Sequence, residues 1–301
     1  MKIIVAATPD VAIPTLNWLV TSEHQLLSVI TQPDRPAGRG RSIKESVVSE
    51  WSRQHDIACL KPASVTEIAT LIEGADVLLT IGYGVLLPEN LLSIPMHGCL
   101  NLHFSLLPRW RGAAPVQRAI EAGDSLSGVT VFALDPGMDT GPIYSVKRFA
   151  LDSDITSDEL FSELGVLGVE AVEDSLKAIE AGIRPEPQKN DGATRAMKIS
   201  KEECEIDWKL DAQLISQKIR AFTSLPGAWT RFRSEVVKID SVSISEEILQ
   251  PGVLKVVNKE LLVGTASEAL SIGFLTPAGK SRMDAKSWLN GARVNDGEFF
   301  G

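Results

Sequence analysis

Residues 2–32, KIIVAATPDVAIPTLNWLVTSEHQLLSVITQ, decide the fold of this chain. Lys2–Ala7 is a continuous apolar run, which is typical of a strand buried in a parallel sheet. The segment Thr8-Pro9-Asp10 then breaks this strand. Apolar residues recur at helical spacing over 13–20, and a second strand is expected over 26–32. Strand, helix and strand in this order predict a βαβ unit.

The same alternation continues to about residue 181. Further strands are expected over 58–60, 77–81, 98–103, 128–134 and 144–149 (the last antiparallel), and helices over 45–55, 65–72, 114–122 and 156–181. We therefore expect an α/β domain with a Rossmann-like, mostly parallel sheet. Residues 6–10 are AATPD where a dinucleotide-binding turn would carry GxGxxG, so an NAD-dependent dehydrogenase is excluded at this turn.

A change of pattern near residue 190 predicts a second domain. Residues 184–195, RPEPQKNDGATR, are polar and carry two prolines, and the helix–strand rhythm stops there. One helix and several short β-rich runs follow, separated by turns, which is typical of a small β-barrel. We expect a catalytic domain at 1–189, a linker at 190–208 and a small C-terminal OB-like β-barrel domain at 209–301.

The composition limits the class of protein. The 301 residues are 44% hydrophobic and 23% charged, with no apolar run long enough for a membrane span. The apolar N-terminus is too short for a signal peptide, so we expect a cytoplasmic protein that does not bind membranes. Cys59, Cys99 and Cys204 are far apart, so we expect neither a disulfide framework nor a metal site. The net charge of −9 argues against nonspecific binding of nucleic acid.

One basic island stands out from this acidic background. Residues 35–44, RPAGRGRSIK, hold four cations and no anion; the cations are Arg35, Arg39, Arg41 and Lys44. Cations interleaved with Gly and Pro make a flexible loop that can reach phosphates. A basic surface loop can also be merely solvated, and the island by itself does not decide between the two.

The residues most suited to catalysis lie between positions 99 and 142. Asn101 and His103 are two apart on a predicted strand, so their side chains share a face at the ligand-binding edge of the sheet. An amide can donate to a developing oxyanion, and an imidazole can act as general acid or base. Asp139, in a loop framed by glycines and a proline, can deliver a carboxylate to the imidazole. Each of the three alone can equally be structural. Together, with no Ser or Cys nucleophile in a supporting context, they suit attack by an amine on a carbonyl.

Three segments around these residues resemble the folate-dependent formyltransferase family. They are 101–108 (NLHFSLLP), 111–115 (RGAAP) and 135–142 (DPGMDTGP). The resemblance implies 10-formyltetrahydrofolate as the formyl donor and an amine as the acceptor. It also implies that no metal takes part.

The resemblance also assigns residues. It implies a catalytic set of Asn101, His103 and Asp139. It implies folate binding by two loops whose residues are Gly82, Tyr83, Gly84, Val85, Leu86, Ser105, Leu106, Leu107 and Pro108. A hydrophobic loop with exposed backbone groups suits a flat pterin ring.

The acceptor is indicated by other parts of the chain. Residues 32–41, QPDRPAGRGR, resemble the loop of those family members that formylate methionyl initiator tRNA for translation initiation. Further likeness to their C-terminal part lies at 198–203, 206–208, 219–222, 226–228 and 277–280. We therefore expect initiator Met-tRNA as the partner, contacted by Arg35, Arg39, Arg41 and Lys44, and a monomeric enzyme. Two alternatives remain: a formyltransferase acting on a sugar nucleotide or on glycinamide ribonucleotide, and a nonenzymatic folate- or RNA-binding module.

Overall fold

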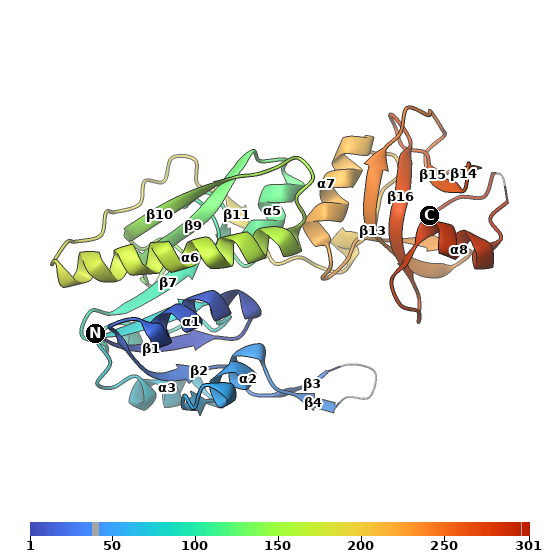
Figure 1. Cartoon of the computed structure of the whole chain (residues 1–301). Coiled ribbons are helices and arrows are strands. Elements are labelled where there is room, and N and C mark those ends of the chain that lie inside the picture. Colours follow the sequence, from blue (N-terminus) through green and yellow to red (C-terminus); the bar gives the residue numbers. More distant parts are fainter. Residues whose placement is uncertain (38–41, 296) are drawn as a thin grey trace. The chain divides into compact units, whose positions relative to one another are not determined.

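The computed structural model describes residues 1–37, 42–295 and 297–301 (Figure 1). The chain forms two compact units. Unit 1 contains Met1–Pro115, Leu126–Ala150 and Phe161–Met197, and unit 2 contains Val116–Ser125, Leu151–Leu160 and Lys198–Gly301. The boundaries expected at 189/190 and 208/209 remain predictions. Within the described ranges, no helix is both long and apolar enough to cross a membrane.

Unit 1 is built on a seven-stranded sheet with the order β10-β9-β7-β6-β1-β2-β5. Its strands are β1 (Lys2–Ala7), β2 (Gln25–Ile30), β5 (Cys59–Leu60), β6 (Val77–Ile81), β7 (Cys99–His103), β9 (Leu126–Ala133) and β10 (Ile143–Ala150). The mostly parallel Rossmann-like sheet predicted from the sequence is confirmed. The strand expected to be antiparallel, β10, does pair in this way with β9. Because β9 also pairs antiparallel with β7, β9 is the strand that runs against the others.

Helices flank this sheet. They are the 3₁₀ turn η1 (Asp10–Ala12), α1 (Ile13–Thr21), α2 (Val47–Gln54), α3 (Val65–Leu71), α4 (Glu89–Leu92) and α6 (Ser157–Glu180), which belongs to unit 1 from Phe161 on. Helix α5 (Pro115–Glu121) belongs to unit 2 from Val116 on. The long helix α6 lies over one face of the sheet (Figure 1). A Cβ at Gly168 of α6 would come within 2.7 Å of Leu102 Cδ2, so this glycine allows the helix to approach β7 closely. Leu102 is thereby buried beneath α6, and its neighbours Asn101 and His103 face the other way.

The two described ends of the basic island form the strands of a hairpin. Strands β3 (Arg35–Ala37) and β4 (Ser42–Lys44) pair antiparallel, with Arg35 opposite Lys44. Arg39 and Arg41, which were predicted to contact tRNA, lie outside the described residues. The hairpin was expected only as a loop, because a stretch rich in Pro, Gly and Arg is typical of a surface loop and gives no sign of the short strand pairing.

Unit 2 contains the C-terminal antiparallel sheet. Its strands are β12 (Trp229–Phe232), β13 (Glu235–Ile244), β14 (Leu254–Val257), β15 (Glu260–Val263), β16 (Leu270–Pro277) and β17 (Met283–Asp284), and its helices are η2 (Glu202–Cys204), α7 (Ala212–Phe222) and α8 (Ala285–Ala292). The order is β12-β13-β16-β15-β14, with β17 on β16. Register shifts around Ser241 curl β13, as bulges do, and give the sheet the half-barrel form expected of a small OB-like domain. Trp208, Phe232, Trp288 and Phe300 form an aromatic core beneath it.

Candidate active site

The carboxyl ends of three adjacent parallel strands position the candidate site. Strands β1, β6 and β7 are neighbours in the sheet, and Ile81 pairs with Leu102 in register. The loops that follow β6 and β7 therefore leave the sheet at the same edge, which is where open α/β sheets bind ligands. Asn101 and His103 are among the last three residues of β7, next to this edge.

Asn101 is oriented by the neighbouring strand. Thr80 of β6 pairs with Asn101 in register, and its hydroxyl proton is shared between Asn101 Oδ1 at 2.7 Å and the Leu100 carbonyl oxygen at 3.0 Å. Since Oδ1 is engaged, the Nδ2 amide is the group that Asn101 can offer as a donor. Asn101 is only partly buried, so this donor remains within reach of a bound substrate.

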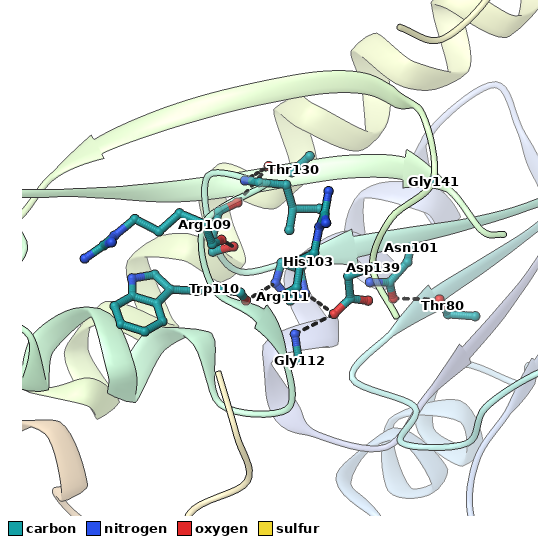
Figure 2. A network of polar contacts seen from close by, with 12 residues as sticks. Thr80, Asn101, His103, Arg109, Trp110, Arg111, Gly112, Thr130, Asp139 and Gly141 are labelled. Carbon is teal, nitrogen blue, oxygen red and sulfur yellow. Dashed lines mark hydrogen bonds and ion pairs between the residues drawn. The ribbon is translucent and has the colours of Figure 1, made fainter. Parts of the chain in front are cut away.

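His103 is held between a carbonyl and a carboxylate (Figure 2). Its Nε2 lies 2.9 Å from the backbone oxygen of Trp110, and its Nδ1 lies 3.8 Å from Asp139 Oδ2. A carbonyl can only accept, so Nε2 carries a proton and donates it. In the neutral imidazole the unprotonated nitrogen is then Nδ1, which faces Asp139. The arrangement provides a nitrogen base beside a carboxylate.

Burial affects the charge of this imidazole. His103 is 5% exposed and packs edge-on against the ring of Phe132. Loss of hydration holds the pKa of His103 below its usual value, although the Asp139 carboxylate and the bond to the Trp110 carbonyl both act to raise it. The neutral imidazole therefore predominates near pH 7, in the form that can accept a proton.

Asp139 reaches the imidazole from a constrained loop. Its backbone is left-handed, with φ 53°, and its Oδ2 accepts a hydrogen bond of 2.7 Å from the Gly112 N–H. Asp135, at the start of the loop, accepts bonds from the Gly137 N–H and the Thr140 hydroxyl. The loop thus closes on itself, and Asp139 is the acid that it points at His103 (Figure 2).

Residues 194–196, which the sequence did not assign to the site, contact the strand that holds it in place. Arg195 and Ala196 form strand β11, which pairs in parallel with β8 (Arg111–Gly112). Thr194 Oγ1 accepts a hydrogen bond from the Trp110 N–H at 2.9 Å, which fixes the residue whose carbonyl binds His103. The sequence showed here only a polar stretch expected to be a linker, and such a stretch carries no periodic signal that could reveal these contacts.

Gly112 is required where these segments meet. Its φ is 128°, and a Cβ there would lie 2.5 Å from the Ala196 carbonyl oxygen. A glycine at this position lets β8 approach β11 while its N–H still points at Asp139.

Comparison with known proteins shows the family of this chain. Residues 1–174 match the family model described as formyl transferase, and residues 198–293 match the model of the formyl transferase C-terminal domain. The chain belongs to the formyl transferase family. A methionyl-tRNA formyltransferase from Salinispora tropica is 42% identical over 305 residues, covering 99% of each chain, and another from Rhodococcus erythropolis is 40% identical over 98% of each.

Solved structures share the fold. HypX from Aquifex aeolicus, determined in complex with tetrahydrofolic acid, is 19% identical with a TM-score of 0.67; the match covers 96% of this chain and 46% of HypX. A methionyl-tRNA formyltransferase from Clostridium thermocellum is 17% identical with a TM-score of 0.57, over 81% of this chain and 94% of that one.

The residues predicted to bind folate in this formyl transferase lie in the loops after β6 and β7, and they differ in what they expose. The side chains of Tyr83, Ser105 and Leu107 are buried. Tyr83 belongs to the hydrophobic core, and the Ser105 hydroxyl donates to the Arg109 carbonyl at 2.7 Å. These three can reach a ligand only through their backbone groups. Gly82, Gly84, Val85, Leu86, Leu106 and Pro108 are exposed or partly exposed, and Leu86 is 70% exposed.

Of the residues predicted to contact tRNA, Arg35 and Lys44 lie among the described residues, and neither belongs to the polar network around His103. Lys44 is exposed at the end of β4, and Arg35 lies on β3. Among the described residues of the chain, no group of three or more His, Cys, Asp or Glu side chains could hold a metal ion. The predicted metal-free reaction stays a prediction.

Proposed function

We propose that this formyl transferase moves the formyl group of 10-formyltetrahydrofolate to the α-amino group of methionine on initiator tRNA. The observation that carries the proposal is the grouping of an amide, a neutral imidazole and a carboxylate, with His103 between the Trp110 carbonyl and Asp139. The methionyl-tRNA formyltransferases at about 40% identity over nearly their whole length support the choice of acceptor.

Asn101 has the role of stabilising charge. When bound, the folate supplies an activated formyl group whose oxygen becomes negative as the amine adds. The Nδ2 amide of Asn101 is the donor suited to that oxygen, since Thr80 occupies Oδ1. A donor fixed before the reaction stabilises the developing charge without having to reorganise.

His103 and Asp139 handle the proton. Only a neutral amine can attack, and it must lose a proton after attack. The His103 Nδ1 is unprotonated near pH 7 and lies beside the Asp139 carboxylate, so the pair can accept that proton and pass it to the folate nitrogen, whose bond to the formyl carbon breaks as tetrahydrofolate leaves. The carboxylate stabilises the imidazolium that forms, and the Gly112 N–H keeps the carboxylate in place.

The loops after β6 and β7 are proposed to bind the folate. The exposed apolar side chains of Val85 and Leu86 and the open backbone at Gly82 and Gly84 suit a flat ring bearing hydrogen-bonding edges. Tyr83 contributes through its carbonyl, which already accepts a bond of 2.8 Å from Gln32 Nε2.

The acceptor is proposed from the basic hairpin. Positive charge is concentrated in one short segment of a chain whose net charge is −9; the cations are Arg35, Arg39, Arg41 and Lys44. Such a segment suits contact with the phosphates of a tRNA. Transfer to a sugar nucleotide would use the same catalytic residues, but such an acceptor does not explain why residues 35–44 hold four cations. We further propose that the enzyme acts as a cytoplasmic monomer.

One assay separates the candidate acceptors. Purified protein is given 10-formyltetrahydrofolate with methionyl initiator tRNA, uncharged initiator tRNA or a free amino sugar, and formylated product is measured. Transfer to the charged tRNA alone is expected. Transfer to the amino sugar at a comparable rate, or to none of the three, contradicts the proposal.

A variant pair tests the hairpin. Replacing Arg39 and Arg41 together by Ala should raise the KM for tRNA at least about tenfold and reduce its salt dependence, because phosphate contacts are lost. The control is Lys177→Ala on the exposed face of α6, where the cation pairs with Glu173. An unchanged KM in the double variant would remove the hairpin from the tRNA interface.

A further inference from the structure

The side chain of Gln188 joins the catalytic loop to Arg111. Its Nε2 donates to the backbone oxygens of Asp139 at 3.0 Å and Gly141 at 2.7 Å. Its Oε1 accepts from Arg111 Nε at 3.2 Å and Nη2 at 2.7 Å. All four polar contacts of this amide are therefore made to the segment that carries the catalytic acid or to the strand beside it.

The orientation of this amide is fixed by chemistry. Backbone oxygens only accept hydrogen bonds and the guanidinium only donates, so the NH₂ must face the loop and the oxygen must face Arg111. If the amide were rotated, its oxygen would face the backbone oxygens of the loop and its NH₂ would face the Arg111 guanidinium, so no hydrogen bond could form on either side. Gln188 is partly buried, which reduces competition from water for these bonds.

These bonds complete a closed circuit around Asp139. Its side chain is held by the Gly112 N–H, its backbone is held by Gln188, and Gln188 is held by Arg111, the residue next to Gly112. Strand β8 therefore fixes both the carboxylate and the main chain of the same residue. The left-handed backbone of Asp139, with φ 53°, is a conformation that a non-glycine residue needs such support to retain.

We propose that Gln188 is a positioning residue, which sets the distance between the Asp139 carboxylate and His103 without touching substrate. This role rests on the proposed function of the site. It places a determinant of the reaction in the polar segment beyond the sheet, 49 residues from the acid that it positions.

Two substitutions at Gln188 distinguish positioning from simple attachment. Gln188→Glu keeps the size of the side chain and strengthens its contact with Arg111, but it removes both donors to the loop. Gln188→Ala removes the hydrogen bonds to the loop and also those to Arg111. If the donors matter, both variants lose kcat by about 10- to 100-fold, because displacing a reacting group by about 1 Å has that effect. The KM values for folate and tRNA should stay within about threefold.

Asn190→Ala is the matched control. Asn190 Oδ1 accepts from Arg111 Nη1 at 3.3 Å, so it contacts the same arginine from the same segment but does not touch the loop. This variant should keep wild-type kcat. Thermal unfolding of all the variants shows whether any loss of kcat is a loss of folded protein.

Amide hydrogen exchange gives a second readout, which does not depend on activity. The Gly112 N–H should exchange faster in both Gln188 variants, because its acceptor Asp139 is no longer held. The Ala113 N–H, which donates to Ala196, serves as the internal reference and should not change. Should wild-type protein transfer no formyl group to Met-tRNA, the proposed function fails, while the exchange comparison still decides the positioning. Wild-type kcat in Gln188→Glu, or unchanged Gly112 exchange, overturns the inference.

Discussion

The most direct test of the catalytic assignment is Asp139→Asn. The substitution keeps the size of the side chain and an oxygen that can accept the Gly112 N–H, whose bond is 2.7 Å. It removes the negative charge 3.8 Å from His103 Nδ1. The fold should therefore be retained while the electrostatic support of the imidazolium is lost.

The expected loss follows from that distance. Two unit charges about 4 Å apart interact by about 4 kcal/mol at an effective dielectric constant of about 20. Their screening by water is limited, because the His103 side chain is 6% exposed and that of Asp139 is 15% exposed. At about 1.4 kcal/mol per factor of ten, the charge contributes about 10³-fold to the rate if the imidazolium forms on the path. We expect kcat to fall by about this factor, with little change in the KM for folate.

The assay is formylation of methionyl initiator tRNA at saturating folate, with thermal unfolding measured on the same samples. Asp135→Asn is the control, since Asp135 lies in the same loop but binds Thr140 and Gly137 in place of His103. It should stay within about tenfold of wild type. If Asp139→Asn keeps kcat within about threefold of wild type with an intact fold, the carboxylate has no part in proton transfer and the reasoning is refuted.

Three further predictions concern the residues around this acid. Asn101→Ala should lower kcat by about 10²- to 10³-fold at unchanged thermal stability, as removal of an oxyanion donor does, and a near-normal kcat would exclude it as that donor. Since burial lowers the folded-state pKa of His103, the unfolded chain takes up the proton first as the pH falls. The stability contribution is complete above the unfolded pKa of about 6.5 and is lost as the pH falls toward the folded value. His103→Gln should flatten this loss in urea midpoints measured against pH, and an identical pH dependence would contradict the assignment. Gly112→Ala, whose Cβ would meet the Ala196 oxygen at 2.5 Å, should lower the free energy of unfolding by about 1–3 kcal/mol; an unchanged urea midpoint would show that β8 can yield.

The sheet and the shared face of Asn101 and His103 could be predicted because their signals are local. Apolar runs and helical spacing reveal each strand and helix within about ten residues, and the βαβ rule then fixes their neighbours. Asn101 and His103 share a face by the two-residue period of a strand. Asp139 was linked to them as a carboxylate in a loop framed by glycines and a proline, and also through the resemblance to a known family; in the structure its Oδ2 lies 3.8 Å from His103 Nδ1.

Side-chain direction in loops could not be predicted in the same way. The run 82–88 indicates a loop, but nothing in it shows that Tyr83 turns into the core while Leu86 remains 70% exposed. The Ser105 hydroxyl could bind a ligand, but in the structure it donates its hydrogen bond to the Arg109 carbonyl. Loop conformation depends on partners elsewhere in the chain, and a local pattern does not contain them.

The support of the site is nonlocal for the same reason, and it has a common source. Trp110, Gly112 and Asp139 all have positive φ, at 63°, 128° and 53°. Each is held by the segment 188–196: Trp110 by the Thr194 hydroxyl, Gly112 by its pairing with Ala196, and Asp139 by Gln188. Unusual backbone at functional sites persists only where its surroundings determine it, so the polar stretch once expected to be a plain linker is what makes this geometry possible. Because these bonds act on the direction of His103 and Asp139 and add little buried apolar area, changes at Gln188 and Thr194 should affect turnover before they affect stability.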